Sequence, residues 1–383
     1  MLKNRNEVLK ISFSAFFADL GYQAVVASFP IIFVLIFKAP IPLYGFAEAL
    51  NYGIGTVMAY AGGLAGDRFG RKRIAILGNV LILFTSLIGL SRDYIQALIF
   101  FMIGWWFRNF RSPPRRAMMA EVTSPEERSE AFGILHSLDI AGALIAIIYL
   151  TVLLYLRVSI FFVLLFTSIP LLMSTIVLTM VNAGKKSEKA KRKEAESKIT
   201  QKRVFWTLIL STMFFGFSQY SFGFPILTTT EITGKECLGV LSYGIFLGAS
   251  SLFGYLFGRI RMKEFESLAF LGYLIGALGS LGFAYLSSFG VFSLYPLSFL
   301  MGTSVASTET FEPTIISKIT KEEAFSTSMG YLSAGRSIGI FLGNVIMGFL
   351  YQISYTYAYL FAAITSLISF ALILNLIMRP NAS

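Results

Sequence analysis

The chain has little charge and almost none of the residues that build catalytic and metal sites. Only 14% of its 383 residues are charged, whereas a soluble domain carries roughly 25%. Cys237 is the single cysteine and His136 the single histidine, which excludes an internal disulfide framework and a histidine-rich metal site. The phosphate-binding pattern GxxxxGKS/T, metal-ligand spacings and a nucleophile elbow are missing from the sequence. We therefore expect no enzyme activity, no cofactor, no bound metal and no use of ATP.

Apolar residues are abundant instead. The sequence is 55% hydrophobic and 15% aromatic, with a mean hydropathy of +0.70. A chain of this length and apolarity cannot hide its surface in one soluble core, so we predict an all-α integral membrane protein. The net charge of +11 could suggest nucleic acid. The bases lie in short loops between apolar segments, however, so they report membrane topology, and lipid is the expected partner.

Apolar runs between charged or Gly/Pro-rich breaks predict twelve transmembrane helices. They lie near residues 9–36, 43–66, 74–90, 95–120, 129–155, 158–181, 204–229, 238–258, 267–287, 291–316, 326–350 and 355–378. Most of the 32 lysines and arginines fall on the side that carries both termini. Because positive loops stay inside, both termini are predicted to be cytoplasmic.

The one long polar stretch, residues 182–203, is predicted to be a basic cytoplasmic linker between two six-helix bundles, 1–181 and 204–383. The two halves look related. Pro30 and Pro225 take matching places in helices 1 and 7, and Gly142 matches Gly339. A parallel repeat of this kind is typical of transporters in which two bundles move around a central site. Chance similarity among apolar segments is the alternative.

Residues 63–73 lie between two apolar runs and hold three glycines, one acid and four bases. This stretch resembles the signature loop of the major facilitator superfamily. The matching positions are Gly63, Asp67, Arg68, Gly70, Lys72 and Arg73. Residues 19–22, 29–30, 45–50, 110–117 and 131–139 further resemble a prokaryotic subset with no common substrate. The resemblance implies twelve helices in two pseudo-symmetric bundles and a multi-pass protein of a prokaryotic cell membrane. Family drug/proton antiporters usually have a proline in helix 5, which residues 141–147 lack.

The same resemblance implies a cytoplasmic gate. In this family the loop acid docks on the start of helix 11, where Ser326, Thr327 and Ser328 lie here. Arg68 or Arg71 is then expected to reach Glu121. The simpler alternative is that Asp67 satisfies its own loop and the bases only set topology. In the second half, Arg259 stands where Asp67 does in the first, so that half is expected to lack the matching latch or to rebuild it from Glu264.

Charged residues inside predicted helices are functional candidates, because each costs about 2.5–3.5 kcal/mol to insert. Asp19 lies midway along helix 1, and Gln23 shares its face. The resemblance places helices 1, 4, 7 and 10 around the central cavity. We therefore expect Asp19 to bind a proton or substrate, with a structural ion pair as the alternative.

Two further sets of charged residues stand in predicted helices. Helix 4 holds Arg108, Asn109 and Arg111, and the matching part of helix 10 holds Glu309 and Glu312. These residues are expected to pair across the cavity or to bind parts of a charged solute; a local pair with Asp19 is the alternative. In helix 5, His136 and Asp139 share a face and suggest a proton relay, although a core histidine is commoner. Arg336, the counterpart of Asp139, could contact helix 2 or the cavity, and Glu48 is expected to be solvated.

Together these features predict a monomeric secondary active transporter that moves a small organic solute by rocker-switch alternating access. The buried charges nearly balance, which favours proton coupling and a neutral, zwitterionic or cationic solute over a polyanion. Export is slightly favoured because of Asp19 and the many aromatic residues. The alternatives are an uptake symporter or uniporter for a specific polar metabolite, and a transport-inactive sensor on the same fold.

Overall fold

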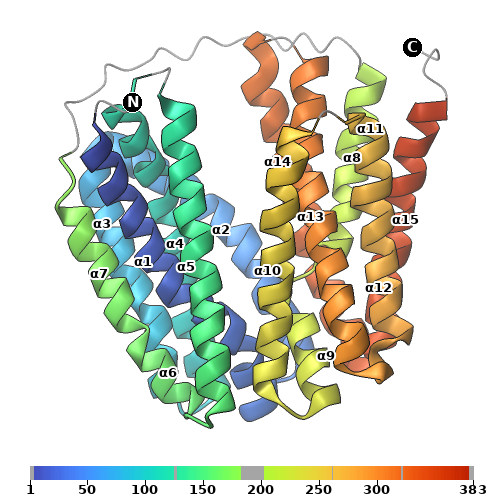
Figure 1. The fold of residues 1–383 in the computed structure, drawn as a ribbon, viewed down its shortest axis with the longest axis horizontal. Coiled ribbons are helices and arrows are strands. Elements are labelled where there is room, and N and C mark those ends of the chain that lie inside the picture. Colours follow the sequence, from blue (N-terminus) through green and yellow to red (C-terminus); the bar gives the residue numbers. More distant parts are fainter. Residues whose placement is uncertain (1–3, 125–126, 183–201, 261, 321, 379–383) are drawn as a thin grey trace. The chain divides into compact units, whose positions relative to one another are not determined.

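The computed structural model describes residues 4–124, 127–182, 202–260, 262–320 and 322–378. The side chains of residues 128, 129, 317 and 322–327 are not described. The described chain is helical almost throughout (Figure 1). The helices are α1 (Arg5–Pro30), α2 (Ile41–Phe69), α3 (Arg71–Leu81), α4 (Tyr94–Val122), α5 (Arg128–Tyr155), α6 (Ile160–Phe166), α7 (Ser168–Thr179), α8 (Lys202–Ser218), α9 (Gly223–Thr233), α10 (Glu236–Arg259), α11 (Glu264–Ser267), α12 (Ile275–Tyr285), α13 (Val291–Ile319), α14 (Glu322–Ile353) and α15 (Tyr355–Met378).

Several of these helices join end to end into one span. The π-helical segment η1 (Ile31–Ile36) extends α1, the 3₁₀ segment η2 (Ile82–Leu90) extends α3, and the π-helical segment η3 (Leu268–Leu274) joins α11 to α12. A short 3₁₀ turn, η4 (Ser287–Phe289), precedes α13. The predicted all-α fold of twelve spanning helices is confirmed. Within the described residues, eight of these helical spans are long and apolar enough to cross a membrane by length and composition alone.

The chain divides into two compact units, and the division does not simply follow the sequence. The first unit comprises Met1–Ala39 and Gly53–Ala190, and the second comprises Pro40–Tyr52 and Lys191–Ser383. The start of α2 thus packs in the second unit and the rest of α2 in the first. The predicted bundle limits and the linker 182–203 remain a prediction, because residues 183–201 lie outside the described part of the chain.

In the first unit, α1 packs along α5 and α7, and α3 packs along α4. Gly142 of α5 allows the closest approach to α1, because a Cβ atom there would lie 2.3 Å from the carbonyl oxygen of Phe16. The backbones of α1 and α5 therefore touch one turn before Asp19. Residue 142 must therefore be glycine for α5 to pack this closely on α1. It lies in the same stretch of helix 5 that lacks the proline of the antiporter motif.

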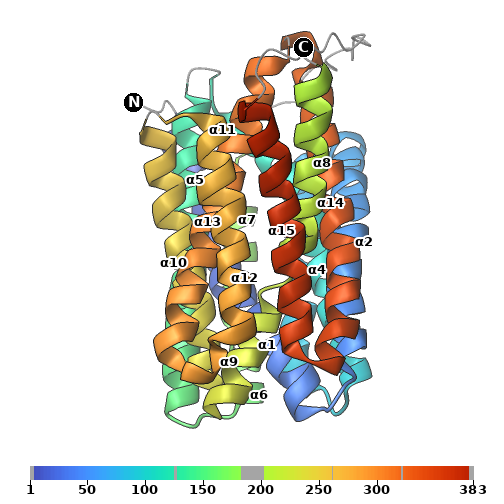
Figure 2. The same cartoon turned by 90° about the vertical axis from the view of Figure 1, so that its right-hand side faces the viewer.

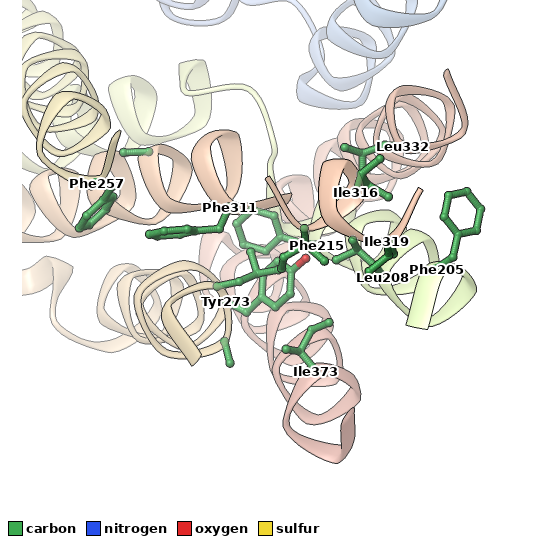
Figure 3. Packing of buried hydrophobic residues seen from close by; sticks show 14 residues of the cluster. Phe205, Leu208, Phe215, Phe257, Tyr273, Phe311, Ile316, Ile319, Leu332 and Ile373 are labelled. Carbon is green, nitrogen blue, oxygen red and sulfur yellow. The ribbon is translucent and has the colours of Figure 1, made fainter. Parts of the chain in front are cut away.

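In the second unit, α8 packs against α14 and α15, and α10 packs against α13 (Figure 2). The apolar core of this unit gathers around Phe215 and Tyr273, whose rings lie 4.9 Å apart between centroids (Figure 3). The hydroxyl of Tyr273 is the polar atom at the centre of this cluster, so it needs a hydrogen-bond partner.

The corner between α2 and α3 is tighter than expected. We predicted that helix 2 ends near residue 66 and that helix 3 begins near 74, but α2 continues to Phe69 and α3 begins at Arg71. Only Gly70 separates them, with φ = 102°. Glycine adopts this left-handed region without strain because it has no Cβ. Most of the signature stretch is therefore helical, and a single residue makes the turn.

The seventh predicted helix, residues 204–229, is broken. α8 ends at Ser218 and α9 begins at Gly223. Pro225 follows the break, and a proline ring clashes with the carbonyl four residues earlier in a continuous helix. The buried side chain of Asn344 on α14 accepts a hydrogen bond from the Ser221 backbone N–H at 2.8 Å. In helix 1, by contrast, the chain continues past Pro30 as the π-helical η1.

Candidate functional site

A buried carboxylate and its hydrogen-bond partners lie on α1. Asp19 is only 5% exposed. The Tyr22 hydroxyl donates a hydrogen bond to the Asp19 carboxylate, and the Gln23 amide donates another at 3.3 Å. Residues three and four positions apart share a helix face, which explains why α1 itself supplies both donors. Tyr22 was not among the predicted site residues; its spacing from Asp19 is the signal that could have identified it.

Arg108 of α4 completes this arrangement, which we call the α1–α4 polar chain: Asp19, Tyr22 and Arg108. The Arg108 guanidinium donates to the Tyr22 hydroxyl at 3.2 Å. Its central carbon lies 5.2 Å from the Tyr22 ring centroid and 4.9 Å from that of Trp105, within cation–π distance. Arg108 and Gln23 are partly exposed, whereas Asp19 and Tyr22 are buried. The α1–α4 polar chain therefore connects the partly exposed guanidinium of Arg108 to the buried carboxylate of Asp19 through Tyr22.

Asn109 and Arg111 point to other parts of the first unit. The Asn109 amide donates to the carbonyl of Trp105 in its own helix and lies against Gly55 of α2. Arg111 is 1% exposed and donates to the side chain of Asn79 on α3. The amide of Asn79 in turn donates to Ser174 and Thr175 of α7, both at 2.9 Å. Arg111 thus ties α4 to α3 and α7, while the expected pairing of Arg108 and Arg111 with Glu309 and Glu312 of the other unit stays a prediction.

Asp139 of α5 pairs with a base that the sequence analysis did not single out. Arg115 of α4 lies 3.4 Å from the Asp139 carboxylate, and its side chain is 6% exposed. His136 is exposed, and the ion pair recorded for Asp139 is with Arg115. The geometry therefore supports a helix-to-helix ion pair here, while the His136–Asp139 proton relay stays a prediction.

In the second unit, Arg336 of α14 forms ion pairs with both Glu309 and Glu312 of α13. Glu312 is fully buried and also accepts a hydrogen bond from Tyr273 at 2.9 Å. The Glu309 side chain is 56% exposed. The two glutamates therefore have a partner on the neighbouring helix of their own unit, and the expected contact of Arg336 with helix 2 or the cavity stays a prediction.

The two ion pairs occupy equivalent sequence positions with opposite signs. Arg115 and Glu312 are 197 residues apart, and so are Asp139 and Arg336. The first unit thus has a base on α4 and an acid on α5, and the second has an acid on α13 and a base on α14. Arg115 could have been found from sequence by applying the repeat spacing to Glu312.

The signature residues form a local network at the α2–α3 corner. Arg71 lies 3.2 Å from Asp67 and 2.7 Å from Glu121 at the end of α4. Of the two arginines expected to reach Glu121, the structure records this contact for Arg71. Arg68 lies over the ring of its neighbour Phe69. Lys72 and Arg73 stand in the first turn of α3, and Gly63 approaches Pro113 of α4.

The second half has a counterpart of this network. Lys318 at the end of α13 pairs with Glu264 at 2.5 Å, and Arg259 lies over Tyr255. Glu121 and Lys318 are also 197 residues apart, so this corner repeats the inversion of sign. The proposed docking of Asp67 on the start of α14 stays a prediction, because Ser326 and Thr327 lie outside the residues whose side chains are described.

Comparison with known proteins gives the family. The model of the Major Facilitator Superfamily matches residues 11–314 and 267–383. An uncharacterised MFS-type transporter of Methanocaldococcus jannaschii is 25% identical over 387 aligned residues, covering 96% of this chain and 94% of that protein. The fold is similar to that of the nucleoside transporter NupG, with a TM-score of 0.78, 13% identity and coverage of 96% of this chain and 99% of that one. It is also similar to a peptide transporter POT in complex with sulfate, with a TM-score of 0.76, 13% identity and coverage of 97% and 94%. The chain therefore belongs to the Major Facilitator Superfamily and is a multi-pass membrane protein of transmembrane transport.

Proposed function

We propose that the protein is a proton-coupled secondary active transporter that exports a small organic solute from a prokaryotic cell by rocker-switch alternating access. The α1–α4 polar chain is the observation that supports this proposal. Asp19 is a buried carboxylate on a membrane-spanning helix, and Tyr22 connects it to the partly exposed Arg108. Ionisable groups at such depth are costly and are retained for function by default.

The polar chain has a simple coupling chemistry. While Asp19 is ionised, its charge balances Arg108 through Tyr22. When Asp19 takes up a proton, that balance is lost, and the remaining charge of Arg108 disfavours a cationic solute that the neutral pair admits. The guanidinium lies within cation–π distance of both Trp105 and Tyr22, which favours the same position for the cation during this exchange. Proton binding and solute binding thereby oppose each other through one arginine, as export in exchange for protons requires.

The aromatic residues around the α1–α4 polar chain mostly pack against one another. Phe29 stacks on Phe101 with ring centroids 3.8 Å apart, and both are buried. Trp105 is the partly exposed member of this column beside Arg108. An amphipathic solute with a flat apolar part and a polar group suits a site made of Trp105, Gln23 and Arg108, which favours export of such compounds.

A second candidate function is uptake of a zwitterionic or charged metabolite by a symporter or uniporter. The exposed carboxylate of Glu309 beside Arg336 favours it, because an acid and a base side by side match the two ends of a zwitterion. In either case the partners we propose are a small-molecule solute, protons and lipid, and the protein acts as a monomer with cytoplasmic termini.

The experiment that tests the proposed function is a thermal-shift screen of the purified protein in detergent. Lipophilic cations, dipeptides and nucleosides are added at about pH 5.5 and about pH 8. We expect at least one class to raise the melting temperature, with an apparent affinity that changes by up to about tenfold per pH unit, the limit for linkage to one proton.

Asp19→Asn should remove this pH dependence, and Glu130→Gln, which neutralises an exposed acid at the start of α5, is the matched control. If stabilising solutes bind Asp19→Asn and the parent with the same pH dependence, proton coupling does not pass through Asp19.

A further inference from the structure

Glu48 of α2 is enclosed, although its place near the end of a predicted helix suggests solvation. Glu48 belongs to the segment Pro40–Tyr52, which packs in the second unit. The residue is only 8% exposed. The charge distribution predicts that this end of α2 lies on the side away from the cytoplasm. Glu48 is thus a buried acid near the start of α2, whereas the signature residues lie at the end of that helix.

The segment around Glu48 is packed too closely for water to enter easily. A Cβ atom at Gly45 would lie 2.4 Å from the carbonyl oxygen of Asn344 and 2.7 Å from the Cα of Gly348, so α2 and α14 are in backbone contact. The Tyr44 ring packs on Phe224 of α9 with centroids 5.2 Å apart. The Ile41 backbone N–H also donates to the Gln352 side chain at 3.4 Å.

The groups that face Glu48 are uncharged. They are the hydroxyls of Tyr44 and Ser221 and the side-chain amide of Asn51. Among the described residues, none of the ion pairs includes Glu48. Other titratable groups on the elements packed here include Tyr52 of α2, Tyr220 in the α8–α9 break, Glu231 of α9 and Tyr351 of α14. The bases on α2 and α14 are engaged elsewhere: Arg68 lies over Phe69 at the far end of α2, and Arg336 pairs with Glu309 and Glu312.

An ionised carboxylate in these surroundings is unfavourable, because burying a charge without a counter-charge costs several kcal/mol. A neutral carboxyl group fits better. It has one O–H donor to place, and the buried Oδ1 atom of Asn51, three residues away, has no hydrogen-bond partner in the described part of the chain. The protonated acid can donate to Asn51 Oδ1 while Tyr44 and Ser221 donate to its other oxygen.

We propose that Glu48 is a proton-binding site that holds residues 40–52 of α2 against α14 and the α8–α9 break. When the segment leaves this surface, Glu48 meets water and releases its proton. Proton binding therefore stabilises the packed arrangement, and alkaline pH favours its opening. The proposal rests on the opening and closing that alternating access requires, but it is independent of Asp19 and of the solute.

The test measures the α2–α14 contact itself rather than transport. Spin labels are attached at Ile41→Cys and Gln352→Cys in a Cys237→Ser background, and their distance distribution is recorded in lipid nanodiscs at about pH 5.5 and about pH 8.5. In the parent, the ratio of short to long distances should fall as the pH rises, by at most about tenfold per pH unit for one proton. Glu48→Gln, which cannot ionise, should keep the short distance at both pH values.

Glu231→Gln is the matched control, because it neutralises an exposed acid on α9 near the same surface. It should follow the parent. A pH-independent distance in the parent would overturn the proposal, and so would a pH response that survives in Glu48→Gln. Should Glu48→Gln not fold, the infrared carbonyl band of a protonated carboxyl group gives a second test. That band must be present in the parent at neutral pH and weaker in Glu48→Asp, whose shorter side chain reaches Asn51 less well; an unchanged band contradicts the assignment.

Discussion

Two adjacent glycines at the end of α2 meet different surroundings. A Cβ atom at Gly62 would lie 1.9 Å from the backbone oxygen of Phe110 on α4. At Gly63, which belongs to the family signature, the nearest atom is the Cβ of Pro113 at 3.8 Å, an ordinary contact. The close approach of α2 to α4 therefore depends on Gly62, while Gly63 leaves room for a small side chain.

Gly62→Ala should destabilise the protein by about 1–3 kcal/mol, because α2 and α4 must separate to admit the methyl group. Gly63→Ala is the matched control and should change stability by no more than about 0.5 kcal/mol. Melting temperatures of the two variants in the same detergent measure the difference. Equal melting temperatures would show that the α2–α4 contact is looser than described.

Residue contacts also show where sequence reasoning stops. Arg108 and Arg111 are three residues apart on helix 4, and from the sequence we expect the same role of both, pairing with Glu309 and Glu312 or binding a solute. Side chains at this spacing still differ by about 60° around the helix axis. That difference turns Arg108 towards Tyr22 and Arg111 towards Asn79. Helix rotation of this size is set by packing against neighbours, and a single sequence carries little information about it.

At the scale of elements, each unit has an ion pair between two equivalent helices, with the acid and the base exchanged. Arg115 of α4 pairs with Asp139 of α5 in the first unit, and Glu312 of α13 pairs with Arg336 of α14 in the second. The pair in the second unit is the more enclosed: Glu312 is fully buried, whereas the Asp139 side chain is 26% exposed. Removing one partner of a buried pair leaves an uncompensated charge and typically costs about 3–5 kcal/mol, whereas partly exposed pairs contribute much less. The two pairs should therefore respond differently to the same substitution.

Arg336→Gln should destabilise the second unit by about 3–5 kcal/mol, and adding Glu312→Gln should recover most of that loss, because the buried charge is then gone. Arg115→Gln is the equivalent change in the first unit and should cost about 1 kcal/mol or less, since Asp139 keeps access to solvent. A double-mutant cycle followed by thermal unfolding measures the coupling. Additive effects of Arg336→Gln and Glu312→Gln would argue against a buried ion pair.

The sequence could locate these elements better than it could predict their irregularities. Apolar runs predicted twelve spans, and the structure has them. The break between α8 and α9 was missed, because residues 204–229 form one apolar run and a proline does not always interrupt a helix: the chain continues past Pro30 in the matching helix. At the break, the side chain of Asn344 accepts a hydrogen bond from the backbone N–H of Ser221. Asn344 is close in space but 123 residues away in sequence, so a local sequence pattern cannot reveal it.

At the scale of the whole molecule, the family resemblance rested on residues 63–73, and it is confirmed over the entire chain. The same residues carry no information on the solute, because they pack at a corner formed by α2, α3 and α4. Information on cargo and coupling must come from the buried acids. Asp19 in the first unit and Glu48 in the second are each held by a tyrosine of their own helix.

The measurement that tests the central claim most directly is proton movement driven by a solute gradient. The protein is reconstituted into liposomes that contain a pH-sensitive dye, and a solute identified by thermal shift is applied across the membrane. We expect the parent to move protons in the direction opposite to the solute, and Asp19→Asn to move the solute without proton movement. Proton movement of equal size in Asp19→Asn and the parent would contradict coupling through the α1–α4 polar chain.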